Sequence, residues 1–273
     1  MRCAFQRSTV LAIGLAVGLW SAAPPLAAAE MSPATWGNPD QPWGVRRPVA
    51  AADRALIASY RSGRKTPALE TNFADPTELQ SQWALQSDDR SDLKSCRQPQ
   101  NVVAGPAGLE LRTLAATTCR AQWSTGFLIR KSKRTYGFFE ATIKAADISG
   151  LNNAFWLVSE GAFEIDVAEV HYPNDLHMTV HSWATSAGTA VGFDSKLSGD
   201  FSKAFHDFGV LWTPTDIIFA VDGEPVAAMA TRGAIAKPAD IRFSTALAPF
   251  AGKIPANPAG HAMYVKSLRV YPL

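Results

Sequence analysis

Short strand-like runs separated by turns fill most of the chain, and few segments have a long helical pattern. The run 136–145 (YGFFEATIKA) is rich in aromatic and β-branched residues and alternates polar with apolar side chains. The runs 178–183 (MTVHSW) and 263–271 (MYVKSLRVY) have the same character. Such alternation is typical of strands that bury one face. We therefore predict an all-β fold, an antiparallel sandwich, from Asn72 to the end of the chain.

One β-hairpin is predicted with particular clarity. The apolar runs 217–221 and 224–227 are separated only by Asp222-Gly223. An Asp-Gly pair readily adopts the two positive φ angles that a type I′ turn requires. Pro225 lacks the N–H that a central strand would donate, so we expect the return strand to lie at a sheet edge there.

The first 29 residues have the layout of an export signal. Arg2 and Arg7 precede an apolar stretch (10–20), and the small residues 27–29 (AAA) offer a cleavage site. The apolar stretch is too short to span a bilayer comfortably and is followed by two prolines, which argues against a retained membrane anchor. We predict a signal peptide over 1–29 and a secreted or periplasmic protein without membrane contact after cleavage.

Charge excludes one class of partner. Arg2 and Arg7 are the only charged residues of the signal, so 24 Lys+Arg remain against 24 Asp+Glu. A neutral chain without a basic run lacks the electrostatic footprint of a nucleic-acid-binding protein. The neutral charge favours a neutral polymer or a small molecule as the partner. We also expect the protein to be a monomer.

Two cysteines remain after signal removal, Cys96 and Cys119. In an exported protein such a pair favours one disulfide, although two buried thiols are the alternative.

Residues 30–66 differ from the rest of the chain because they are rich in proline and arginine. We interpret them as an N-terminal extension or linker ahead of a main domain over 67–273. Residues 50–60 contain good helix formers and predict a short helix. Trp36 and Trp43 leave two alternatives open, which are docking on the main domain or a flexible tail.

The segment 163–170 (FEIDVAEV) is the most informative for function because it places three carboxylates in an apolar strand-like run. Glu164 and Asp166 share one face of a regular strand, about 7 Å apart. Glu169 would point to the other face unless one extra residue intervenes. A β-bulge at Val167-Ala168 would bring all three acids to the same side.

Three acids on one face repel one another and raise their pKa values, which is costly unless chemistry uses them. The arrangement suits glycoside hydrolysis, in which one carboxylate attacks the anomeric carbon and a second donates a proton to the leaving oxygen. The third can share a proton with the nucleophile. A solvated acidic strand and a calcium site are the alternatives.

The string Glu164-Ile-Asp-Val-Ala-Glu169 resembles the signature of glycoside hydrolase family 16 in its bulged form. The segments before it (YGFFEATIKAADISGLNNAFWLVSE), after it (FHDFGVLWTPTDIIFAVDGEPV) and at the end (MYVKSLRVY) are similar too. The resemblance implies a β-jelly-roll sandwich of two curved sheets with an open concave cleft for a polysaccharide. It implies an endo-acting, retaining mechanism with Glu164 as nucleophile, Asp166 as assisting acid and Glu169 as general acid/base.

Aromatic side chains fit a sugar cleft because the C–H faces of sugar rings stack on them. Trp156 matches the family position that stacks near the cleavage point. Further candidates for substrate contact are His181, Trp183, Trp123 and one of the pair Asn152 and Asn153, of which we take Asn153; core packing or a turn is the alternative for each.

Other chemistries have less support. His171, His177 and His181, with Asp175, suggest zinc. His177 and His181 are four residues apart in a predicted strand, which places them about 13 Å apart, too far to share one ion. The chain has no G-x-S-x-G nucleophile elbow and no phosphate-binding glycine motif. Family relatives often hold a structural calcium, but Lys266 stands where an Asp is common and Glu70 alone does not suffice. We therefore predict no cofactor and no metal.

We predict an enzyme that cleaves internal bonds of a β-glucan (β-1,3 or mixed-linkage β-1,3-1,4) or of a bacterial exopolysaccharide. The alternatives are a galactan hydrolase of the agarase or carrageenase type, a non-catalytic carbohydrate-binding sandwich, and a structural wall protein. The intact acid triple argues against the binding module, since binding relatives typically lose one acid.

Overall fold

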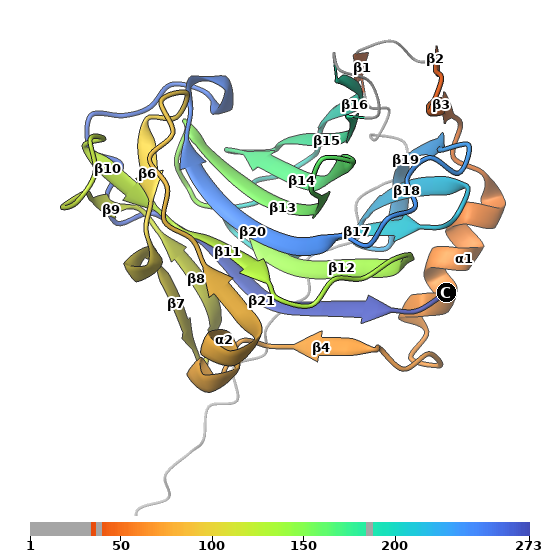
Figure 1. The fold of residues 1–273 in the computed structure, drawn as a ribbon, viewed down its shortest axis with the longest axis horizontal. Helices are drawn as coiled ribbons and strands as arrows, with labels where there is room; N and C mark the ends of the chain where they lie inside the picture. Colours follow the sequence, from red (N-terminus) through yellow and green to blue (C-terminus); the bar gives the residue numbers. More distant parts are fainter. Residues whose placement is uncertain (1–33, 37–39, 184–187) are drawn as a thin grey trace, which may run out of the picture.

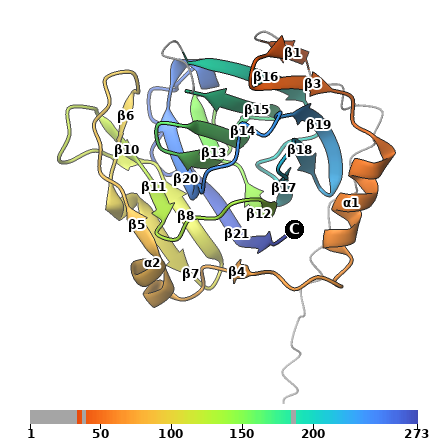
Figure 2. The same cartoon turned by 45° about the vertical axis from the view of Figure 1, so that its right-hand side comes forward.

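Two large antiparallel sheets pack face to face in the computed structural model, which describes residues 34–36, 40–183 and 188–273 (Figures 1 and 2). The eight-stranded sheet contains, in spatial order, β1 (Ala34–Trp36), β16 (Thr189–Lys196), β15 (Asp175–Ser182), β14 (Phe163–His171), β13 (Leu151–Ser159), β20 (Asp240–Leu247), β11 (Phe127–Arg130) and β5 (Trp83–Leu85). The ten-stranded sheet contains β2 (Asp40–Gln41), β3 (Gly44–Arg47), β19 (Glu224–Ala230), β18 (Asp216–Val221), β17 (His206–Trp212), β12 (Gly137–Lys144), β21 (Ala262–Tyr271), β8 (Gly108–Arg112) and β7 (Val102–Gly105), with β4 (Leu69–Thr71) paired to β21. Both sheets are curved, and the predicted sandwich is confirmed.

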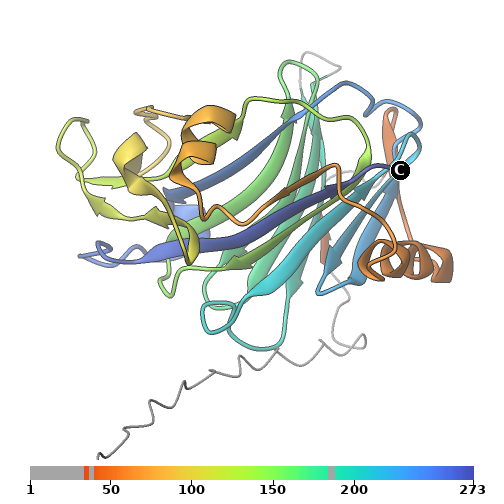
Figure 3. The same ribbon diagram turned by 90° about the horizontal axis from the view of Figure 1, so that it is seen from below.

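A small third sheet and a few helices complete the described fold. The small sheet consists of β6 (Ser95–Arg97), β10 (Trp123–Thr125) and β9 (Leu114–Ala115). The helices α1 (Ala51–Arg61) and α2 (Pro76–Gln82) lie at opposite ends of the sandwich (Figure 3). Two 3₁₀ turns, Pro99–Asn101 and Pro249–Ala251, lie in loops. None of the helices in the described ranges is long and apolar enough to cross a membrane.

Alternating side chains from the two sheets form one core between them. On β12, Phe139, Ala141 and Ile143 face this core, and Phe163 and Ile165 face it from β14. The period of two that predicts these strands is therefore the period with which their side chains face this core. A smaller apolar cluster on the outer face of the ten-stranded sheet, including Ile57 and Tyr60 of α1, accounts for the docking of that helix.

The predicted strands and hairpin are present with small differences in their ends. The run 136–145 forms β12, 263–271 forms β21, and 178–183 forms the second half of the longer strand β15. Asp222 and Gly223 have φ angles of 52° and 86°, as a type I′ turn requires. β3 pairs with β19 only at Ala228–Ala230, so Pro225 lies where that side of β19 has no paired strand.

The N-terminal segment packs against the sandwich where it is described. β1 pairs with β16, and β3 pairs with β19, so the segment reaches one edge of each large sheet (Figure 1). Trp43 is 5% exposed, and its Nε1 donates to Thr189 Oγ1 at 2.6 Å. Docking is the alternative that holds for both tryptophans, because Trp36 belongs to the paired strand β1 and Trp43 is buried. The predicted signal peptide, residues 1–29, lies outside the described residues.

Cys96 and Cys119 form the predicted disulfide. The two cysteines are 23 positions apart in the sequence, and the bond closes the loop between them. Replacing both with serine should lower the free energy of unfolding by about 2–3 kcal/mol, because the unfolded chain regains the entropy of that open loop. Urea denaturation of the oxidised protein and of the double variant measures the difference. An unchanged midpoint would show that the disulfide does not stabilise the fold.

Candidate active site

A β-bulge in β14 brings the three acids to one face. Asp166 lies opposite Thr179 of β15 while Glu169 lies opposite His177, so three steps along β14 match two along β15. The register against β13 shifts at the same place. Val167 and Ala168 both pack into the core, and only 2% and 1% of their surfaces are exposed. The extra residue predicted at this position is therefore present, and it turns Glu169 to the side of the other two acids.

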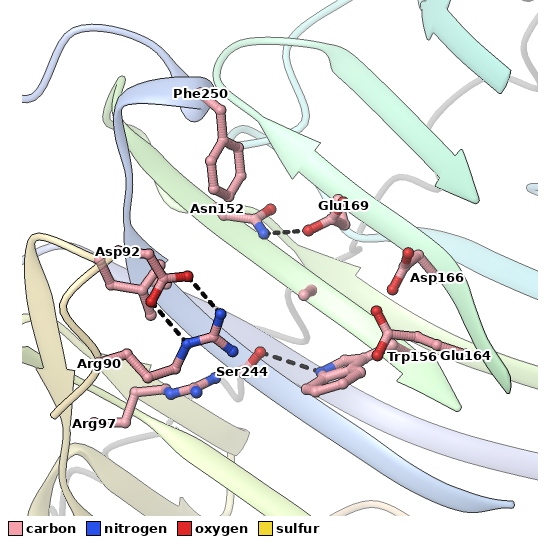
Figure 4. A pocket seen from close by; sticks show the side chains of 13 residues that line it. Arg90, Asp92, Arg97, Asn152, Trp156, Glu164, Asp166, Glu169, Ser244 and Phe250 are labelled. Carbon is pink, nitrogen blue, oxygen red and sulfur yellow. Dashed lines mark hydrogen bonds and ion pairs between the residues drawn. The ribbon is translucent and has the colours of Figure 1, made fainter. Parts of the chain in front are cut away.

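Glu164, Asp166 and Glu169 line one pocket on the outer face of the eight-stranded sheet (Figure 4). The pocket has a volume of about 190 Å³ and also receives side chains from β13, β20 and the loop before β6. Asp166 lies at its base with 5% of its surface exposed.

Burial raises the pKa of all three acids. The pKa of Glu164 rises to about 8, first through burial and then through the charge of Asp166. Burial also raises the pKa of Asp166 well above its usual range, with Glu169 adding to the effect, and it raises that of Glu169. Glu164 therefore holds a proton at neutral pH. The raised pKa of Glu169 favours the protonated form that a general acid requires.

Glu164→Gln should stabilise the fold at neutral and alkaline pH. Glu164 has an ordinary pKa of 4.5 when unfolded and about 8 when folded, so the folded state loses stability as the pH rises between these values. The neutral Gln avoids this cost, and its advantage should grow from pH 5 to pH 8 and reach about 1–3 kcal/mol. Thermal melts at the two pH values measure it. If the variant and the parent protein differed equally in stability at both pH values, ionisation of Glu164 would not destabilise the fold.

His181 touches the acid cluster as predicted for a cleft residue. It lies opposite Glu164 on β15, and its Nε2 is 3.2 Å from Asp166 Oδ2. Glu164, Asp166 and His181 offer atoms within 4.8 Å of one another, a spacing that a metal ion could use. These side chains also contact one another, since His181 pairs with Asp166 and a hydrogen bond joins Glu164 to Asp166.

The choice of Asn153 for the cleft is corrected by the structure. Asn153 is 2% exposed, accepts a hydrogen bond from Ala146 N and donates to the carbonyls of Leu151 and Val170. Its neighbour Asn152 points to the pocket instead, and its Nδ2 donates to Glu169 Oε1 at 2.5 Å. Asn153 therefore holds the backbone around β13, while Asn152 holds Glu169.

Trp156 lines the pocket, but neighbours flank its ring. Phe127 stacks on it with centroids 5.6 Å apart, and the Arg242 guanidinium lies 4.8 Å from its centroid. Its Nε1 donates to Ser244 Oγ at 3.2 Å (Figure 4). A half-buried, firmly held indole of this kind forms a rigid wall of the pocket.

The other two tryptophans lie further from the acids. Trp183 follows β15 in alternation with His181 and is 40% exposed, which leaves it available to a long polymer. Trp123 packs instead against the apolar cluster of Ile148, Leu151 and Leu247, so the packing alternative holds for it.

Several pocket residues were not predicted from the sequence. Arg90 and Arg97 line the side opposite the acids, and each guanidinium is paired with a carboxylate, Asp92 and Asp88 respectively. Phe250, in a 3₁₀ turn at the rim, is 62% exposed. All three come from loops or short strands. Such segments are too short or too irregular for an alternating sequence pattern to predict which side chains face the pocket.

Comparisons with known proteins agree with this geometry. Residues 91–266 match the model of the glycosyl hydrolases family 16. The chain is 30% identical over 158 residues to the endo-1,3-1,4-beta-glycanase EglC of Rhizobium meliloti (strain 1021), covering 55% of this chain and 33% of that protein. It is 31% identical over 119 residues to the beta-agarase AgaB34 of Agarivorans albus, covering 37% and 26%. The chain thus spans about a third of the length of the curated relatives it matches.

Solved structures share the fold at lower identity. The laminarinase catalytic domain of Thermotoga maritima MSB8 superposes with a TM-score of 0.68 at 16% identity, covering 77% of this chain and 98% of that one. SCLam, a non-specific endo-beta-1,3(4)-glucanase, superposes with a TM-score of 0.69 at 19% identity, covering 83% and 94%. Since the family match spans more than half of the sequence and includes all three acids, the chain belongs to glycosyl hydrolase family 16.

Proposed function

We propose that the chain is a secreted or periplasmic endo-acting, retaining glycoside hydrolase that acts as a monomer and without a cofactor on a polysaccharide. The observation that carries the proposal is the bulged strand β14, which presents Glu164, Asp166 and Glu169 together in one pocket. Family membership and the glycan-cleaving relatives support it. The disulfide supports export.

In the first step Glu164 attacks the anomeric carbon, and the glycosidic C–O bond breaks as Glu169 transfers its proton to the leaving oxygen. Glu164 must be ionised to attack. A hydrogen bond joins it to Asp166, so their shared proton can move to Asp166 when the sugar arrives. In the second step Glu169 removes a proton from water, which attacks the glycosyl ester and releases Glu164.

Asn152 has a defined part in this scheme. Its Nδ2 donates to Oε1 of Glu169, which leaves Oε2 to carry the proton toward the leaving oxygen. The bond also lowers the pKa of Glu169 against the effect of burial.

Asn152→Ala should therefore reduce the rate about tenfold and move the alkaline limb of the pH–rate profile to higher pH, since Glu169 would release its proton less readily. Profiles on a soluble glycan measure both effects. Ser244→Ala is the control, because Ser244 lines the same pocket but bonds Trp156. An unshifted limb in Asn152→Ala would contradict this role.

For the substrate we propose a β-glucan, either β-1,3 or mixed-linkage β-1,3-1,4, or a bacterial exopolysaccharide. The similarity to the endo-1,3-1,4-beta-glycanase EglC supports a β-1,3-1,4-linked glycan. A galactan is the second candidate because of the similarity to AgaB34. A reducing-sugar assay across laminarin, lichenan, succinoglycan, agarose and carrageenan distinguishes them, with Glu164→Gln as the inactive control. New reducing ends from none of them, with binding retained, would instead support a carbohydrate-binding sandwich.

A further inference from the structure

A second hollow lies beside the acid pocket on the outer face of the eight-stranded sheet. Its volume is about 330 Å³, and the side chains that line it are Glu169, His171, His177, Thr179, Asp194 and Phe250. Glu169 and Phe250 line both hollows, whereas Glu164 lines the acid pocket alone. The mechanism proposed above gives no part to either histidine.

This hollow lies beyond Glu169 as seen from Glu164. The outer face of β14 presents, in order, Glu164, Asp166, Glu169 and His171, and His177 of β15 lies opposite Glu169. In the proposed first step, the bond that breaks joins the sugar attacked by Glu164 to the oxygen protonated by Glu169. The sugar that leaves is therefore on the far side of Glu169, where the second hollow is.

A hydrogen bond fixes the orientation of His177 at the floor of the hollow. Its Nδ1 lies 2.7 Å from Asp194 Oδ1, and the two residues are direct partners on β15 and β16. An ionised carboxylate only accepts hydrogen bonds, so Nδ1 carries the proton and donates it. Nε2 of the neutral ring is then an acceptor, and 31% of the His177 side chain is exposed. A sugar hydroxyl in the hollow can donate to it.

Aromatic rings form the wall beside this polar floor. The His171 ring centroid lies 4.5 Å from that of His177 and 5.8 Å from that of Phe250. Burial lowers the pKa of His171 to about 4, so its ring is uncharged at neutral pH. Phe250 is 62% exposed and extends the wall to the rim (Figure 4).

The turn that carries Phe250 is held in place by the backbone. Gly150, just before β13, donates its N–H to the carbonyl of Ala251 at 2.9 Å. The N–H of Ala248 donates to the carbonyl of Gly150 at 3.0 Å. An exposed aromatic ring on a turn fixed in this way can stack on the C–H face of a sugar ring without first being ordered.

We propose that this hollow binds the leaving sugar of the substrate, with the sugar ring against Phe250 and one hydroxyl donating to Nε2 of His177. Asp194 and His171 are positioning residues in this arrangement, because they act by holding the His177 ring. The inference rests on the proposed function and names the residues that select the sugar after the cleaved bond. A leaving group that is not a sugar, such as fluoride, makes no use of the hollow.

Two substrates with the same attacked sugar and different leaving groups test the proposal. One is a hexasaccharide of the glycan that the parent protein cuts, laminarihexaose for a β-1,3-glucan, and the other is the β-glycosyl fluoride of the corresponding trisaccharide. Phe250→Ala and His177→Leu should each lower the ratio of kcat/KM for the hexasaccharide to kcat/KM for the fluoride about tenfold. His177→Gln should restore most of the ratio, because its amide oxygen can accept the same hydroxyl.

His261→Leu is the matched control and should leave this ratio unchanged. His261 also bonds an aspartate through Nδ1 at 2.7 Å, namely Asp147, and its side chain is 33% exposed, but it lies outside both hollows. Melting temperatures establish that each variant is folded.

An unchanged ratio in Phe250→Ala and His177→Leu would overturn the proposal. Equal losses on both substrates would mean that the acid cluster is disturbed, and no loss on either would mean that the leaving sugar binds elsewhere. In both cases the parent protein still cuts the hexasaccharide, so the proposed function stands. A parent protein that cuts neither substrate would instead overturn the proposed function and this inference with it.

Discussion

Glu164→Gly is expected to lower the rate of glycan hydrolysis by on the order of 10⁴-fold or more, because it removes the group that forms the covalent intermediate. It also leaves a hole beside the anomeric carbon. Azide can enter this hole and attack an activated β-glycoside from the face that Glu164 occupies. The product should then be an α-azide, identified by proton NMR.

Asp166→Asn is the matched control for this experiment. Asp166 lies in the same cluster and contacts His181, but in the proposed mechanism it forms no bond to the sugar. It should slow the reaction without yielding any azide product. Full activity in Glu164→Gly would mean that this cluster is not the catalytic site.

Glu169→Ala is expected to lower polysaccharide hydrolysis by about 10²–10⁴-fold, the usual contribution of a general acid. Substrates with good leaving groups should be largely spared in the first step, because their departing oxygen needs little protonation. The slow step then becomes breakdown of the glycosyl ester, which azide can accelerate from the other face. The product should be a β-azide, opposite in configuration to that of Glu164→Gly. The same azide anomer from both variants would contradict the assigned roles.

The acid cluster could be predicted from the sequence because parity along a strand is a strict constraint. Glu164 and Glu169 are five residues apart, so only an extra residue between them puts both on one face, and the structure has it. The hairpin was equally determined, since Asp222-Gly223 suits one turn type.

The prediction that Asn153 lies in the cleft is wrong, although parity along β13 distinguishes it from Asn152. Asn152 alternates with Trp156 on β13 and so shares its face, whereas Asn153 points the other way and is buried. The pocket residues Arg90 and Phe250 had no such signal. Only the packing of loops from distant parts of the chain brings them to the cleft.

Proton NMR of the first product released from a β-linked glycan tests the central claim most directly, namely that the three acids of β14 perform a double displacement. Two inversions at the anomeric carbon restore the starting configuration, so the β-anomer should appear first and the α-anomer only later, by mutarotation. An initial α-anomer would contradict the account, because it would mean that water attacks the sugar directly and that Glu164 is not a nucleophile.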